Sequence, residues 1–105
     1  MRDNKYNGWT NYETWNFNLW ITNEEADYNC ALEMAGESTD RWELSKKLEE
    51  WAENMAEYHL TKHSSFIHDM VNSSIKEVNF YEVAKHLWED RTQRMKERSE
   101  LWGEG

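Results

Sequence analysis

Apolar residues recur at helical spacing along most of the chain, most clearly in the segment Asp40–Lys62. There they are separated by three or four positions: Leu44, Leu48, Trp51, Met55 and Tyr58. This spacing places them on one face of a helix. Glutamates and lysines fill the opposite face, as in an amphipathic helix with one side in solvent. The segment is predicted to be the longest helix of the fold.

Four other segments show the same period. We predict helices over Asn11–Ile21, Glu24–Ala35 and Phe80–Ser99, and a fourth that includes Phe66–Val78. The expected inward positions are Ala26, Cys30, Ala31 and Met34 in the second helix, Phe66, Ile67, Met70, Val71, Ile75 and Val78 in the fourth, and Phe80, Val83, Ala84, Leu87 and Trp88 in the last. The candidate N-terminal caps are Thr10 with Glu13, Asn23, Ser38-Thr39-Asp40, His63-Ser64-Ser65, and Asn79 with Glu82. Gly36 is a predicted helix stop.

The stretch Gly8–Ile21 carries an unusual load of aromatic side chains. Tyr12, Trp15 and Leu19 share one helical face, so we expect them to anchor the core. Trp9 and Trp20 do not fit on that face, and Phe17 is also unassigned. Tryptophan at a surface is typical of interface hot spots. We therefore treat Trp9 and Trp20 as candidate anchors for a partner.

No segment alternates apolar and polar residues as a half-buried strand does. The 105 residues include no proline and only 4 glycines, which favours helices joined by few sharp turns. A chain of this length supports one modest core. We predict an all-α, compact single domain of four to five helices over residues 1–105, with loose ends at about 1–8 and 100–105.

The formal net charge of -9 is unevenly distributed. Residues 31–57 hold eight acids and three bases, whereas residues 58–88 hold three of each. One interpretation is an ordinary solvated helix face; the other is a surface that docks on a basic partner. The candidate contact residues are Glu43, Glu49, Glu50, Glu53 and Glu57. Direct binding to nucleic acid is not expected, because phosphates attract Lys and Arg.

The sequence offers little catalytic chemistry. His59 and His63 lie four apart, as do Glu82 and His86, but a zinc site needs three or four converging ligands. The lone Cys30 has acidic neighbours, which raise a thiol pKa and suppress its reactivity. We expect no enzyme activity, metal or cofactor, and a metal-dependent enzyme built on the histidine pair is the less favoured alternative. The single cysteine and the polar N-terminal residues lead us to expect a cytoplasmic protein without a membrane segment.

The segment Asn11-Tyr12-Glu13-Thr14-Trp15 is followed by an aliphatic-Trp-aliphatic step and by Asn23-Glu24. A second motif near the C-terminus is Val78-Asn79-Phe80-Tyr81-Glu82-Val83-Ala84. The two motifs resemble those of an uncharacterised family of small phage and bacterial proteins, with Phe80 in place of a tryptophan of the second motif. The resemblance implies a phage or mobile-element setting and supplies no catalytic residues.

The leading hypothesis is therefore a small acidic phage protein that binds and inhibits a host protein. By analogy with other phage proteins, the target is a defence complex, as for anti-CRISPR or anti-restriction inhibitors. The partner is expected to have a basic nucleic-acid-binding surface, on which carboxylates mimic phosphates. The alternative is a non-inhibitory structural or regulatory phage protein that forms a homodimer, with Leu101 and Trp102 between the subunits.

Overall fold

A computed structural model describes residues 6–60 and 65–102, without the side chains of residues 59, 60 and 98–102. Its five helices are α1 (Tyr12–Asn23), α2 (Glu25–Gly36), α3 (Arg41–Leu60), α4 (Ser65–Glu77) and α5 (Phe80–Trp102). The all-α prediction is confirmed, and each predicted helix has a counterpart. Among the described residues, the only strand-like pairing is an isolated bridge between Tyr6 and Trp9.

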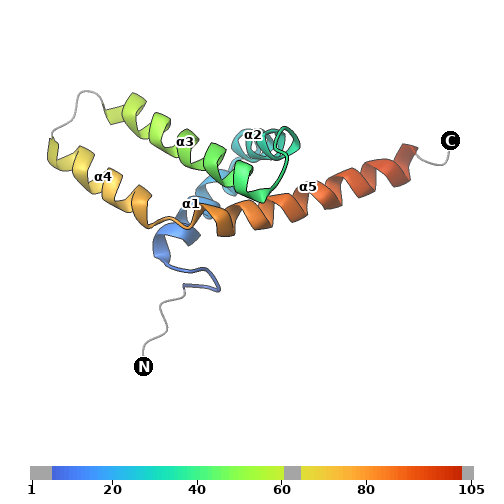
Figure 1. The fold of residues 1–105 in the computed structure, drawn as a ribbon, viewed down its shortest axis with the longest axis horizontal. Coiled ribbons are helices and arrows are strands. Elements are labelled where there is room, and N and C mark those ends of the chain that lie inside the picture. Colours follow the sequence, from blue (N-terminus) through green and yellow to red (C-terminus); the bar gives the residue numbers. More distant parts are fainter. Residues whose placement is uncertain (1–5, 61–64, 103–105) are drawn as a thin grey trace.

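Helices α3 and α4 run antiparallel as a hairpin, and α5 continues from the end of α4 past α3 and α2 (Figure 1). The most extensive packing joins α3 to α5. Residues 92–97 of α5 are all exposed, because this part of the helix projects beyond the body. The radius of gyration is 15.9 Å, whereas a spherical domain of this length has about 13 Å. The fold is thus elongated along α5.

The core draws its buried apolar side chains from α1, α2, α3 and α5. They are Ile21, Ala31, Leu32, Ala35, Leu44, Leu48, Phe80, Val83, Ala84 and Leu87. The predicted inward positions of α5 and the first half of α3 are confirmed. At the other end of α3, Tyr58 is 77% exposed, so the predicted seam does not extend that far. Helix α4 contributes no buried residue to the core.

The predicted inward face of α2 is partly wrong. Ala31 is buried, but Ala26 and Cys30 are exposed, and Leu32 and Ala35 take the expected inward positions. On the side facing α5, the Tyr28 hydroxyl donates a 2.9 Å hydrogen bond to Oδ2 of Asp90. Helix α2 is rotated from the prediction because Leu32 buries more apolar area than Cys30 would, and apolar burial decides helix orientation.

The predicted inward face of α1 is also wrong. Thr14 and Ile21 are buried and Phe17 packs against the core, whereas Tyr12 is 50% exposed and Leu19 is 43% exposed. Apolar side chains surround this helix, so their period alone does not select the buried face. The ring of Phe17, which the sequence left unassigned, makes an edge contact with Phe80 at 5.1 Å between centroids.

Tyr12 and Trp15 instead form an aromatic cluster with Tyr6 at the edge of the fold. The Tyr6 ring lies 5.2 Å from that of Tyr12 and 4.9 Å from that of Trp15. A tight turn brings Tyr6 there, with Asn7 at φ 49° and Gly8 at φ 89°. Two successive positive φ values are typical of the Asn-Gly hairpin turn. These rings therefore make edge and tilted contacts with each other rather than inserting into the core.

Candidate functional site

The N-termini of α1 and α5 lie against each other and share their capping groups. Helix α1 is capped by Asn11, whose Oδ1 accepts from the Thr14 N–H at 2.9 Å and from the Thr14 hydroxyl at 2.6 Å. The Asn11 side-chain amide donates to the Glu77 carbonyl at 2.7 Å. The predicted Thr10 cap is therefore wrong, and one residue further along the chain serves as the cap.

Helix α5 is capped by Asn79, whose Oδ1 accepts from the Glu82 N–H at 3.1 Å, as predicted. In a capping box, the Glu82 carboxylate would in turn accept from the Asn79 N–H. That second bond does not form, because both groups bond to the other motif. The Glu82 carboxylate accepts from the Thr10 N–H at 2.9 Å, and the Asn79 N–H donates to the Thr14 hydroxyl at 2.8 Å. A further bond joins the Asn79 amide to the Thr10 hydroxyl at 3.2 Å.

The two sequence motifs thus meet in space as one interlocked pair of helix caps. Each cap accepts from a backbone N–H of its own helix that would otherwise be unpaired. Further bonds from Thr10 and Asn79 join each cap to atoms of the other motif. This structural role accounts for Asn11, Thr14, Asn79 and Glu82. The two motifs therefore have a structural role in the fold.

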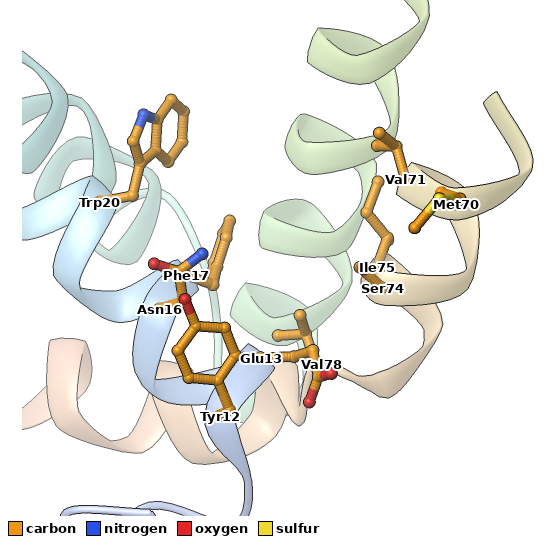
Figure 2. Close-up of a pocket in the computed structure, with 10 residues that line it drawn as sticks. All are labelled: Tyr12, Glu13, Asn16, Phe17, Trp20, Met70, Val71, Ser74, Ile75 and Val78. Carbon is orange, nitrogen blue, oxygen red and sulfur yellow. The ribbon is translucent and has the colours of Figure 1, made fainter. Parts of the chain in front are cut away.

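Next to this junction, an apolar groove of about 470 Å³ lies between α1 and α4. Helix α1 contributes Tyr12, Glu13, Asn16, Phe17 and Trp20. The facing wall holds Met70, Val71, Ser74, Ile75 and Val78. Figure 2 shows the two helices diverging from Glu13 and Val78 at one end toward Trp20 and Met70 at the other. The groove is an open, tapering channel with mainly apolar walls.

Sequence reasoning missed this groove because it joins two helices that are distant along the chain. The apolar face of α4 was recognised, but its residues were expected to face the core. Phe66 is 67% exposed and Met70 is 53% exposed. The one available signal was the polar run Asn72-Ser73-Ser74, which interrupts the apolar pattern of α4.

The five glutamates predicted as a contact face occupy different settings along α3. The Glu43 carboxylate accepts from the Thr39 N–H at 2.6 Å and from the Thr39 hydroxyl at 2.9 Å, and these bonds lower the Glu43 pKa. Glu49 lies 3.8 Å from Lys46, a surface ion pair of small energetic value. The remaining three, Glu50, Glu53 and Glu57, are exposed.

The two candidate tryptophan anchors are also separated. Trp9 packs against the core, and its ring makes a tilted contact with that of His86 at 4.4 Å between centroids. Trp20 is 41% exposed at the wide end of the groove, and its ring lies 5.8 Å from that of Trp51. Trp20 therefore has the surface position expected of an anchor, whereas Trp9 serves the fold.

The candidate chemical groups lie only partly within the described residues. The side chain of His59 and all of His63 lie outside the described parts of the structure, as do the side chains of Leu101 and Trp102. Among residues 6–58 and 65–97, whose side chains the structure describes, no three His, Cys, Asp or Glu side chains gather as metal ligands. Cys30 is exposed; partial burial and then the neighbouring Glu33, Asp27 and Glu37 raise its pKa.

These features define a small all-α domain with an acidic helix face and an open apolar groove. The chain belongs to a family of unknown function, DUF7249, whose model matches residues 2–100. This membership agrees with the resemblance to an uncharacterised family. No curated protein matches the chain, and no solved structure matches it. Among the described helices, none is long and apolar enough to cross a membrane.

Proposed function

We propose that this protein binds another protein through the exposed glutamates of α3 and inhibits it. In this proposal the chain is encoded by a phage or mobile element, and it acts in the host cytoplasm on a defence complex, as anti-CRISPR or anti-restriction proteins do. The partner carries a basic nucleic-acid-binding surface. The mechanism is steric and electrostatic occupation of that surface, without catalysis.

The observation that carries the proposal is the exposed acidic row of Glu50, Glu53 and Glu57. Their spacing of three and four residues places them on one side of α3, over two helical turns. All three are exposed. Together with a net charge of -9 on 105 residues, they produce a negative field that steers a basic partner. Glu43 and Glu49 add to the field, but Glu43 is hydrogen-bonded to Thr39 and Glu49 is paired with Lys46.

The test is a charge reversal of this acidic row with a matched control elsewhere. The test variant carries Glu50→Lys, Glu53→Lys and Glu57→Lys. The control carries Glu33→Lys, Glu37→Lys and Glu89→Lys, three exposed acids on other parts of the surface, so both variants change the net charge equally. Far-UV circular dichroism verifies that both remain helical.

Tagged proteins are incubated with bacterial host lysate, and captured proteins are identified by mass spectrometry. We expect wild type and control to capture the same protein, and duplex DNA to displace it. The α3 variant should lose it. Equal capture by the two variants would refute an acidic-face contact. A stable dimer in light scattering, with no partner captured, would support the homodimeric alternative.

A further inference from the structure

The α1–α4 groove leaves several large apolar side chains in contact with water. Tyr12, Trp20 and Met70 are each about half exposed along its walls. Contiguous exposed apolar side chains are a common feature of interaction surfaces. Phe17 fixes the α1 wall through its contact with Phe80 in the core. The groove therefore has one wall anchored in the core.

The other wall, α4, is held less tightly. None of its residues is fully buried, and Val71 and Ile75, which line the groove, are half-buried. In Figure 2 the side chains of Phe17 and Ile75 extend from opposite walls toward the space between the helices. A segment lying in this space would contact apolar groups on both sides.

The charges indicate the chemistry of that segment. Among the groove-lining residues, all of which the structure describes, Glu13 is the one charged residue and no cation is present. Glu13 was expected to bond back to Thr10, but the Thr10 N–H donates to Glu82 instead. The Glu13 carboxylate extends toward Val78 at the narrow end of the groove (Figure 2). A lysine or arginine of an occupant would be favoured there.

The net charge of -9 also selects between occupants. A second copy of the chain would bring like charges together, which opposes association. A basic segment is attracted by the same field. The groove is open along its length, so it suits a stretch of polypeptide better than a small molecule, which binds in sites that enclose most of its surface. Insertion of an amphipathic helix into an apolar groove is an established mode of peptide recognition.

We propose that the α1–α4 groove binds an amphipathic helix of a basic partner protein. Apolar side chains of this helix pack between Phe17 and Ile75, and a lysine or arginine at one end pairs with Glu13. This inference rests on the proposed function in that the partner is basic, but it assigns the contact to a different surface from the glutamates of α3.

The test uses synthetic 14-residue helical peptides with leucines at positions i, i+3, i+4 and i+7. One peptide carries lysine at the remaining positions and the other carries glutamate. Binding is measured by calorimetry, and methyl NMR shifts locate the contact. We expect the lysine peptide to bind and to shift the signals of Met70 and Ile75. The glutamate peptide should not bind.

Two substitution pairs separate the groove from general surface effects. Met70→Ser should weaken binding about fivefold, since the exposed half of the side chain is buried on binding. Met95→Ser is its control, because Met70 and Met95 are 53% and 51% exposed. Glu13→Gln should weaken binding about threefold, and Glu50→Gln, with the same loss of charge, less than twofold.

Equal effects within each pair, or no binding of the lysine peptide, would overturn the proposal. A dimer in sedimentation that Met70→Ser converts to monomer would also overturn it, because the occupant would then be a second copy. The triple reversal of Glu50, Glu53 and Glu57 tests the proposed function separately. If host capture fails in that variant while the lysine peptide still binds, the two surfaces act independently and the groove assignment stands.

Discussion

Replacement of Thr14 by valine tests the interlocked caps most directly. The Thr14 side chain is fully buried, and its hydroxyl both donates to Asn11 and accepts from the Asn79 N–H. Valine has nearly the same shape, so Thr14→Val removes the hydroxyl without leaving a cavity. The Asn79 N–H would lose its acceptor in a partly buried setting.

The expected cost follows from these two bonds. Leaving a buried donor unpaired costs about 1–3 kcal/mol, and losing an ordinary hydrogen bond costs about 1 kcal/mol. The free energy of unfolding should therefore fall by about 2–4 kcal/mol, a large part of the 5–15 kcal/mol that is typical of a domain. The measurement is urea unfolding followed by far-UV circular dichroism.

Thr22→Val is the matched control in α1. The Thr22 hydroxyl donates at 2.8 Å to the Asn18 carbonyl within the same helix. Because that carbonyl also accepts a backbone bond in a regular helix, the change should cost less than about 0.5 kcal/mol. The reasoning would be refuted if Thr14→Val were no more destabilising than Thr22→Val. Adding Asn79→Ala to Thr14→Val should cost less than the sum of the single changes, since both act on one network.

Three further outcomes are expected. Phe17→Ala should lower the free energy of unfolding by about 3 kcal/mol and Leu19→Ala by less than about 1 kcal/mol, in the same urea assay, since only Phe17 packs on the core; equal losses would contradict the observed face of α1. Burial, and then the hydrogen bond to the α5 carboxylate, raise the Tyr28 pKa above its usual 10.0. The resulting stabilisation should be complete below about pH 10 and lost as pH rises through the folded-state pKa of Tyr28. In alkaline unfolding, Tyr28→Phe should remove this loss of stability. The same pH dependence in Tyr28→Phe and wild type would contradict the role of Tyr28. The raised pKa of the Cys30 thiol should make it react slowly with a thiol reagent at neutral pH, and Glu33→Gln should speed the reaction; an unchanged rate would exclude an effect of that carboxylate.

The helices could be predicted from sequence because the spacing of their apolar residues is a local property of the chain. The seam of Leu44 and Leu48 and the inward positions of Val83 and Leu87 follow from the helical period, and they are buried as expected. Asp40 was one of three alternative caps, and its Oδ1 accepts from the Glu43 N–H at 2.8 Å.

The wrong predictions concern residues whose contacts are made with segments that are distant along the chain. Thr10 and Glu13 have the spacing of a local capping box, but Glu82, which lies 72 residues away from Thr10, supplies the competing acceptor. Nor does any local rule predict that the Tyr12 ring makes an edge contact with Tyr6 instead of entering the core. The groove could not be predicted for the same reason, since it depends on how α4 packs against α1.

The predicted boundaries of α2 show a smaller error of the same kind. Asn23 was expected to cap α2, but it is the last residue of α1, and Glu24 precedes α2 without a side-chain capping bond. Gly36 is the final residue of α2 rather than the residue after it. Helix ends depend on which of several competing bonds the folded chain completes, so the sequence defines them only approximately.

The interlocked caps also have a consequence for the order in which the chain becomes stable during synthesis. Thr14 and Asn79 are 65 residues apart, so at 5–20 residues per second a ribosome needs about 3–13 s to pass from one to the other. Throughout that interval, the first turn of α1 has its Asn11 cap but lacks the bonds to Asn79 and Glu82. The interlocked caps are therefore completed late in translation, after the first turn of α5 has been made.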